Sequence, residues 1–294
     1  MDKVKRRIHY MCADTKNRKY AGKGVGAAVL DTGICLHPDF YGRIMAFKDC
    51  VNKEKRIYDD NGHGTHVAGI LAGDGRMSRG ILSGMAPETH LAVVKVLDRK
   101  GEANVEQILQ GLCWVEENFE RLGIRIVNIS AGASRDLENV KEIQLIRAVE
   151  RLWDDGLVVV VSAGNFGPGK GTVAVPGTSR KVITVGAIKG GKDGGCSGEG
   201  PTEECVVKPD VVAPGLQIIS CNRFTAADKN AAPYTVKSGT SMATPVVSGA
   251  IALLLSKYPD MGNVEVKLRL RESCVPVAGE EGWGCIMVDR FLHG

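Results

Sequence analysis

The chain has 294 residues, of which 44% are hydrophobic and 5% aromatic, and its 38 Lys and Arg outnumber its 34 Asp and Glu by four. This length and apolar content are enough for one large globular domain, and they exclude a disordered, collagen-like or coiled-coil chain. A net charge of +4 over 294 residues creates no domain-wide basic field, so we expect no nucleic-acid partner.

The first ten residues are basic but lack the apolar stretch of a signal peptide. The longest unbroken apolar run, residues 250–255, is far too short to span a bilayer, so we expect no membrane partner. We expect residues 1–21 to form an N-terminal extension and residues 22–294 to form one domain.

Nine cysteines are scattered along the chain with no CxxC pair, and nine is an odd number. This pattern speaks against a disulfide framework and against a zinc ribbon. Isolated thiols suit a reducing compartment, where Cys behaves as a small buried hydrophobic residue, so the sequence predicts a cytoplasmic protein.

Short β-branched runs alternate with amphipathic stretches along the chain. The expected strands are residues 25–30, 91–96, 124–129, 157–163 and 182–185, and the expected helices are residues 104–121, 137–153 and about 241–257. Because the runs are apolar on both faces, they indicate interior strands of a parallel sheet. Alternating βα units predict an α/β fold with a doubly wound, mostly parallel sheet and helices on both faces, in a single domain.

Three polar residues stand where catalytic groups of such a fold gather, near strand ends or helix starts. Asp31 directly follows an apolar strand, His63 lies between glycines before an apolar helix, and Ser241 opens another apolar helix. A serine nucleophile needs an imidazole to take its proton and a carboxylate to orient that imidazole. Each residue also has a local alternative, because Asp ends strands in turns, His flanks helix starts and Ser is a common N-cap.

The three segments together resemble the subtilisin-like serine proteases. The matching blocks are residues 29–34 (VLDTGI), 61–69 (NGHGTHVAG) and 238–245 (SGTSMATP), in the Asp, His, Ser order of that family. Residues 207–215 (VKPDVVAPG) are similar to the bacterial intracellular branch. The resemblance implies a serine endopeptidase that works through an acyl-enzyme intermediate, in which Asp31 orients, His63 acts as base and then acid, and Ser241 attacks.

A fourth block, residues 158–165 (VVVVSAGN), resembles the family strand that ends in an oxyanion-hole asparagine, here Asn165. The family's substrate-binding segments are matched by two tripeptides, which imply that an extended or unfolded polypeptide is held as a β-strand. These are Ser130, Ala131 and Gly132 on one side and Gly101, Glu102 and Ala103, as an edge strand, on the other. Ala174 is expected in the floor of the specificity pocket and Phe166 at its rim.

The proposed chemistry needs no cofactor, but two metal hypotheses stay open. Asp39 lies in a block that ligates structural Ca²⁺ in many family members, although residues 73–83, the expected partner loop, are poor in carboxylates. His66, three residues after His63, raises the alternative of a metal-dependent hydrolase using Asp31 as well. A third alternative is a binding protein that keeps the fold without catalysis. The oligomeric state is not predicted.

Overall fold

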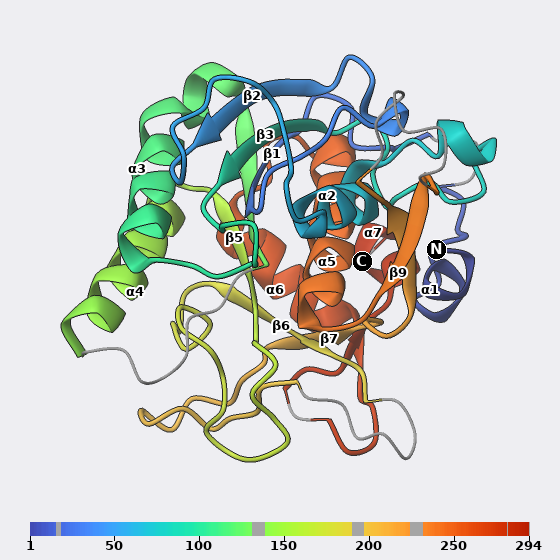
Figure 1. Ribbon diagram of the computed structural model, residues 1–294. Helices are drawn as coiled ribbons and strands as arrows, with labels where there is room; N and C mark the ends of the chain where they lie inside the picture. The colour runs from blue at the N-terminus through green and yellow to red at the C-terminus, as the bar shows by residue number, and fades with distance from the viewer. Residues whose placement is uncertain (16–18, 131–138, 190–196, 224–231, 281, 294) are drawn as a thin grey trace.

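The computed structural model describes residues 1–294 except 16–18, 131–138, 190–196, 224–231, 281 and 294 (Figure 1). The helices are α1 (Asp2–Arg7), α2 (His63–Ala72), α3 (Val105–Leu122), α4 (Asn139–Asp154), α5 (Thr240–Lys257), α6 (Asn263–Ser273) and α7 (Val288–His293), with 3₁₀ turns η2 (Pro38–Phe40) and η3 (Arg76–Ser78). The strands are β1 (Gly26–Asp31), β2 (Ile44–Asp49), β3 (His90–Lys95), β4 (Ile124–Ile129), β5 (Val158–Ser162), β6 (Ile183–Ala187), β7 (Val211–Ala213), β8 (Ile218–Cys221), β9 (Tyr234–Lys237), β10 (Cys274–Val275) and β11 (Cys285–Ile286).

Nine of these strands form one sheet in the order β10-β11-β7-β6-β5-β4-β1-β3-β2. All neighbours pair in parallel except β10 and β11. Helices α3 and α4 contact each other and one face of the sheet, whereas α2 and α5 pack together on the other (Figure 1). The expectation of a doubly wound, mostly parallel sheet in one domain is confirmed.

The five expected strands form within two residues of their expected bounds, because each is buried on both faces. The sequence analysis did not single out β2, β7, β8 or β9. Strand β2 lies at the sheet edge and is half exposed, so it carries no unbroken apolar run. Strands β8 and β9 pair with each other in a separate antiparallel sheet.

Helix α3 shows why these segments are helical. Val105, Ile108, Leu112 and Val115 recur at helical spacing and are all buried against the sheet. The Asn104 side chain caps the start by accepting a hydrogen bond from the Glu106 N–H, and the helix ends at Gly123, whose φ of 59° suits glycine.

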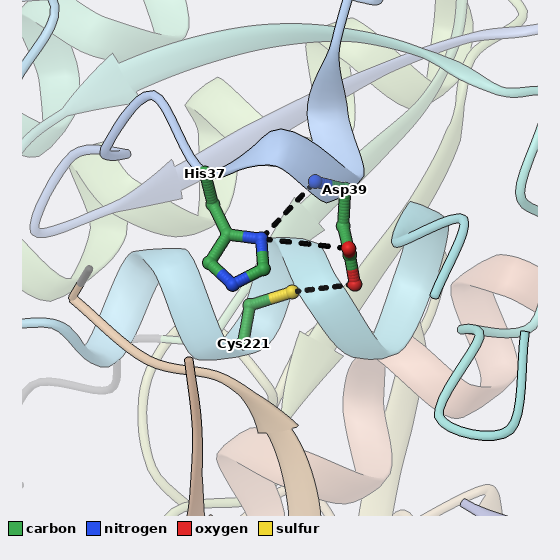
Figure 2. A group of neighbouring side chains, drawn as sticks. All are labelled: His37, Asp39 and Cys221. Atoms are coloured by element: carbon green, nitrogen blue, oxygen red, sulfur yellow. Dashed lines mark hydrogen bonds and ion pairs between the residues drawn. The ribbon is translucent and has the colours of Figure 1, made fainter. Parts of the chain in front are cut away.

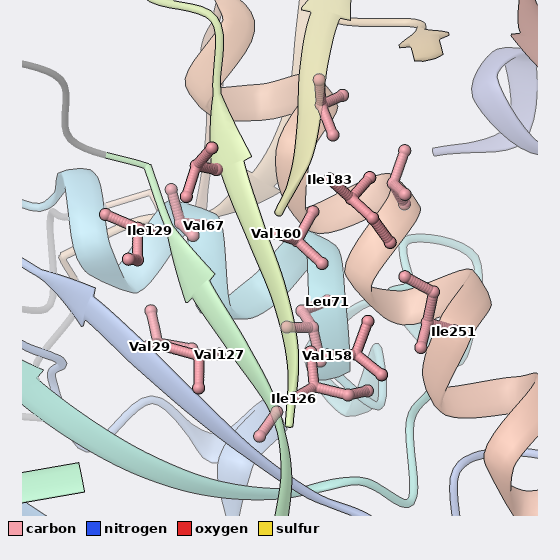
Figure 3. Close-up of a cluster of buried hydrophobic side chains, with 14 of the residues drawn as sticks. Val29, Val67, Leu71, Ile126, Val127, Ile129, Val158, Val160, Ile183 and Ile251 are labelled. Atoms are coloured by element: carbon pink, nitrogen blue, oxygen red, sulfur yellow. The ribbon is translucent and has the colours of Figure 1, made fainter. Parts of the chain in front are cut away.

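The central core lies between the sheet and helices α2 and α5. Figure 3 shows part of this buried cluster, to which the strands contribute Val29, Val158 and Val160, α2 contributes Leu71 and α5 contributes Ile251. Full burial of each such side chain contributes about 1.5–3 kcal/mol. Helix α5 is apolar and long enough to cross a membrane by composition alone, but nearly all of it is buried in this core.

The described part of residues 1–21 packs onto the domain. Ile8 is fully buried, its carbonyl oxygen accepts a hydrogen bond from the Val288 N–H at 2.8 Å, and the Tyr10 hydroxyl donates to the Met85 carbonyl oxygen at 2.8 Å. The described residues of this N-terminal segment therefore pack against the rest of the domain.

Candidate active site

The carboxyl ends of the parallel strands β1, β3, β4 and β5 lie at one edge of the sheet, where Asp31 ends β1, Ser130 follows β4 and Asn165 comes shortly after β5. Asp31 is the last residue of β1 and is fully buried. Its Oδ1 accepts hydrogen bonds from the Thr32 N–H and from Nδ1 of His63, both at 2.7 Å. Oδ2 lies 3.0 Å from the same His63 nitrogen. Asp31 therefore orients the ring, since a carboxylate oxygen accepts and so Nδ1 carries the proton.

His63 is the first residue of α2, and its side chain is 24% exposed. Gly64 must be glycine, because a Cβ there would meet the Gly33 carbonyl oxygen and lie 3.1 Å from the Cβ of Asp31. This close approach of α2 to β1 brings the imidazole within reach of the carboxylate.

Two opposing effects set the pKa of His63. Burial by itself lowers it, but the charge of Asp31 and the hydrogen bond to Nδ1 outweigh burial and raise the pKa above the usual value for histidine. The site therefore stabilises the imidazolium that forms when His63 takes a proton.

Asp59 holds the start of α2, a role that the sequence analysis missed. Its Oδ1 accepts from the Gly62 N–H at 2.7 Å and the Thr32 hydroxyl at 2.9 Å, and its Oδ2 accepts from the N–H and hydroxyl of Thr65 at 2.9 and 2.6 Å. Burial opposes its charge, but these hydrogen bonds keep the pKa of Asp59 below the usual value. The available signal was an acidic residue just before an apolar helix, which is favourable near the helix N-terminus.

Lys95 is a second residue that the sequence analysis missed. Its ammonium is fully buried at the end of β3 and donates to the carbonyl oxygens of Thr32 and Leu97, each at 2.8 Å, and to Oδ1 of Asp60 at 2.7 Å. It therefore ties the segment after Asp31 to the segment after β3. A lysine inside an apolar strand is the signal, because a buried charge must be paired.

Ser241 lies in the first turn of α5, where backbone N–H groups have no intrahelical partner. Its hydroxyl donates to the Ser130 carbonyl oxygen at 2.9 Å, and the Ser130 hydroxyl donates to the Ser241 carbonyl oxygen at 3.2 Å. Ser130 follows β4, the neighbour of β1, so Ser241 lies at the sheet edge where Asp31 ends β1. Ser241 has one hydroxyl proton and donates it to the Ser130 carbonyl oxygen, so in this arrangement it does not donate to His63.

Asn165 comes shortly after β5, and hydrogen bonds to its side-chain oxygen hold its amide group in place. Oδ1 accepts hydrogen bonds from the N–H and the hydroxyl of Thr240, at 3.1 and 3.2 Å. Thr240 precedes Ser241, so the amide group of Asn165 is held against the start of α5. Its Nδ2 lies near Gly239, two residues before Ser241, where a Cβ would be 3.3 Å away.

The segment expected as an edge strand, Gly101 to Ala103, is a tight turn instead. The Asp98 N–H donates to the Glu102 carbonyl oxygen at 3.0 Å, Gly101 has a φ of 82°, and only Ala103 forms a β-bridge, with Leu97. Glycine permits this left-handed backbone. Glu102 and Ala103 line a polar pocket of about 530 Å³.

This turn is connected to the start of α2. Nδ2 of Asn61 donates to the Arg99 carbonyl oxygen at 3.0 Å, and its Oδ1 accepts from the His63 N–H at 3.1 Å. The turn thus lies beside the imidazole even though it is not a strand.

Of the remaining substrate-binding predictions, Ala131 and Gly132 lie outside the described residues. Phe166 is 50% exposed next to Asn165. Ala174 is fully buried, and its N–H donates to the Ala163 carbonyl oxygen at 2.8 Å, so it lies behind the Asn165 loop.

The rings of His66 and His63 hydrogen-bond to different partners, which does not fit a metal site held by both residues. Its Nε2 lies 3.1 Å from the Ile218 carbonyl oxygen and 3.3 Å from that of Thr235, so it links α2 to the β8–β9 hairpin. Burial, helped by the charge of Lys237, lowers the pKa of His66 to about 3. His66 is therefore a neutral buried residue that connects elements.

The surroundings of Asp39 do not fit a calcium ion. Its Oδ1 accepts from the Met77 N–H at 3.0 Å, and its Oδ2 accepts from the Tyr234 hydroxyl at 2.8 Å. The other side chains at the carboxylate are the imidazole of His37 and the thiol of Cys221 (Figure 2). Ca²⁺ requires a shell of oxygen ligands, whereas this set offers nitrogen and sulfur.

The fold and the site together indicate the class of protein. It is a hydrolase in which an imidazole and a buried carboxylate lie at the carboxyl edge of a parallel sheet. The sequence profile described as "Subtilase family" matches residues 22–284. Serine protease AprX of Bacillus subtilis is 42% identical over 297 residues, covering 93% of this chain and 67% of AprX. Subtilisin Savinase of Lederbergia lenta is 33% identical over 273 residues, covering 93% of this chain and 91% of that protein.

Among solved structures, Sphericase superposes with a TM-score of 0.79 at 28% identity, covering 91% of this chain and 92% of Sphericase. The chain belongs to the Subtilase family. It is accordingly a serine endopeptidase that acts on polypeptides, and enzymes of this family need no cofactor for catalysis.

Proposed function

We propose that the chain cleaves peptide bonds through Asp31, His63 and Ser241 with an acyl-enzyme intermediate. The observation that carries this proposal is the 2.7 Å hydrogen bond between Nδ1 of His63 and the buried carboxylate of Asp31. It leaves Nε2 of His63 as the basic nitrogen, which is the tautomer that a serine nucleophile requires.

In the first half-reaction, the Ser241 hydroxyl leaves the Ser130 carbonyl oxygen, gives its proton to Nε2 of His63 and bonds to the substrate carbonyl carbon. The resulting oxyanion accepts hydrogen bonds from Nδ2 of Asn165 and the Ser241 backbone N–H. His63 then passes its proton to the leaving amine as the peptide C–N bond breaks. In the second half-reaction, water gives a proton to His63, attacks the ester, and the proton returns to Ser241.

The substrate is proposed to be an extended or unfolded segment. Ser130 directly follows strand β4, and the turn from Gly101 to Ala103 is connected through Asn61 to the start of the His63 helix, so backbone segments of both are near the site. A peptide held between two backbone segments must be extended, because its own N–H and C=O groups have to face both.

An organophosphonate that reacts with activated serines tests the proposal. We expect one phosphonyl group per chain, located on Ser241 by peptide mass analysis, and loss of peptide hydrolysis in step with labelling. A Ser241→Ala variant should take up no label. Labelling at another serine, or full activity after stoichiometric labelling, would reject the assignment.

We also propose that the protein works in a reducing compartment, the cytoplasm. Eight of its cysteines lie in the described part of the chain, and all eight are free thiols. Thiol titration of freshly isolated, denatured protein should find nine reactive thiols per chain, whereas a disulfide-bonded form would lower that number by two or more.

A further inference from the structure

Three buried side chains from distant parts of the sequence meet beneath the catalytic helix. His37 and Asp39 lie at η2 and Cys221 ends β8, and Figure 2 shows the three facing one another. Nδ1 of His37 is 3.7 Å from Oδ1 of Asp39, and Sγ of Cys221 is 3.6 Å from Oδ2. All three potential ligand atoms lie within 4.8 Å of one another.

His37 is held in the orientation of a metal ligand. Its Nε2 is 2.9 Å from the Pro233 carbonyl oxygen, which can only accept, so Nε2 carries the proton and Nδ1 presents a lone pair. In the metal-free protein that lone pair accepts the Asp39 N–H at 3.1 Å, and a bound cation would replace this hydrogen bond. Burial lowers the pKa of His37 and so favours the neutral ring. Metal-bound histidines are commonly oriented by such a hydrogen bond from the other ring nitrogen to a carbonyl.

Cys221 and Asp39 supply the negative charge. The Cys221 thiol donates its proton to Oδ2 of Asp39, with Sγ 3.6 Å from that oxygen. A divalent cation that replaced this proton would face one thiolate and one carboxylate. The group would then be neutral, which suits a buried position.

We propose that His37, Asp39 and Cys221 form a binding site for one borderline-soft divalent cation, of which Zn²⁺ is the representative. Around a tetrahedral Zn²⁺, ligand atoms of these types are about 3.3–3.6 Å apart. The distances from Nδ1 to Oδ1 (3.7 Å) and from Sγ to Oδ2 (3.6 Å), one to each carboxylate oxygen, are close to that range. Sulfur and imidazole ligands favour Zn²⁺, Co²⁺ or Cd²⁺ over Ca²⁺ and Mg²⁺.

The site is structural, because Cys221 packs directly against the helix that begins at His63. A Cβ on Gly69 of α2 would lie 2.8 Å from Sγ of Cys221. A cation joining Cys221 to His37 and Asp39 therefore clamps η2 and β8 beneath α2. Binding to the folded state alone raises the melting temperature, and one proton leaves Cys221 for each cation bound.

Spectroscopic titration of the full-length Ser241→Ala protein, which cannot digest itself, tests the proposal. After dialysis against a chelator, Co²⁺ is added and the thiolate-to-cobalt charge-transfer band and tetrahedral visible bands are recorded. We expect saturation at one Co²⁺ per chain, displacement by one Zn²⁺, and a rise of several degrees in melting temperature with Zn²⁺.

The decisive variant is Cys221→Ser, which keeps a hydroxyl donor for Asp39. It should lose the thiolate-to-cobalt band, and its Zn²⁺ affinity should fall at least tenfold. The matched control is Cys50→Ser, because Cys50 is also buried but lies outside the group; it should bind like the parent.

Failure of the parent to bind micromolar Co²⁺ or Zn²⁺ would overturn the proposal and leave the group as a hydrogen-bond network only. A thiolate band that survives in Cys221→Ser would overturn it as well, since the sulfur ligand would then be elsewhere. If Cys221→Ser does not fold, His37→Gln decides: it should lose tight binding, and unchanged binding there rejects the site.

Discussion

The hydroxyl of Ser241 is hydrogen-bonded to the carbonyl oxygen of Ser130 at 2.9 Å, and the Ser130 hydroxyl returns a bond to the Ser241 carbonyl oxygen. This pair fixes the start of α5 against the end of β4. It also means that the proposed nucleophile must rotate before attack, because its proton has to move from Ser130 toward His63. Hydrogen bonds of an active site often reach their working geometry only when substrate is bound.

We predict that Ser241→Ala and His63→Ala each abolish peptide hydrolysis, and that the double variant is scarcely slower than either single variant. The two side chains act in one proton transfer, so their losses do not add. Measurements of kcat for all three variants check this. Losses that multiplied in the double variant would mean that the residues act independently.

Asn165→Ala should lower kcat by about 10²–10³, equivalent to about 2.7–4 kcal/mol, with little change in KM. The reason is that Nδ2 binds the oxyanion of the transition state and contributes little to substrate binding. The rate is measured per titrated active site, alongside the melting temperature.

Asn165→Asp is the matched control for that experiment, because it keeps an oxygen for the N–H and hydroxyl of Thr240 but has no amide donor. We expect its kcat to fall at least as far as that of Asn165→Ala. Recovery of kcat in Asn165→Asp would assign Asn165 a purely structural role.

The acid limb of kcat/KM should have a midpoint above about 6.5, the ordinary pKa of histidine. Only neutral His63 accepts the Ser241 proton, and Asp31 raises the pKa of His63, so activity is lost as the pH falls through that raised value. Asp31→Asn should lower the midpoint and reduce kcat by about 10⁴, since the amide favours the wrong tautomer. A midpoint that does not move in Asp31→Asn would contradict this origin of the pKa.

His66 makes the fold sensitive to acid. With a folded-state pKa of about 3 and an unfolded value near 6.5, the unfolded chain binds an extra proton between these values. Its neutral form contributes stability that is complete above about pH 6.5 and is lost as the pH falls toward 3, on the order of 5 kcal/mol in full.

Replacing His66 by Gln removes this titration and keeps a donor for the Ile218 carbonyl oxygen. We expect the variant to be less stable than the parent at pH 8, and the difference to shrink by about 2 kcal/mol at pH 5. Urea unfolding of both proteins in the Ser241→Ala background gives the two free energies. A difference independent of pH would mean that the pKa of His66 is the same in the folded and the unfolded chain.

EDTA should leave the initial rate of a freshly diluted sample unchanged, because the proposed chemistry uses no metal. Any loss should develop over time, as an ion that stabilises the fold dissociates. Immediate inhibition that Zn²⁺ reverses would instead support a metal-dependent hydrolase.

Much of the architecture was predictable from the sequence, since strands buried on both faces, such as β5, must be apolar throughout. The candidate triad was also accessible, because Asp31, His63 and Ser241 each lie in a short segment of restricted composition. Elements without these constraints were not predictable. Strand β2 is half exposed, and the β8–β9 hairpin forms only through its pairing and the contacts of His66.

Contacts between distant residues were decided by the tertiary structure alone. Nothing in the sequence distinguishes Asp59, which holds the start of α2, from its neighbour Asp60, which pairs with Lys95. Likewise, Cys221 is 182 residues from Asp39 in sequence but shares a buried hydrogen bond with it. Local composition determines which segments are buried strands and helices, whereas the meeting of single polar side chains depends on how those elements pack, because a buried polar group is tolerated only where the fold supplies a partner.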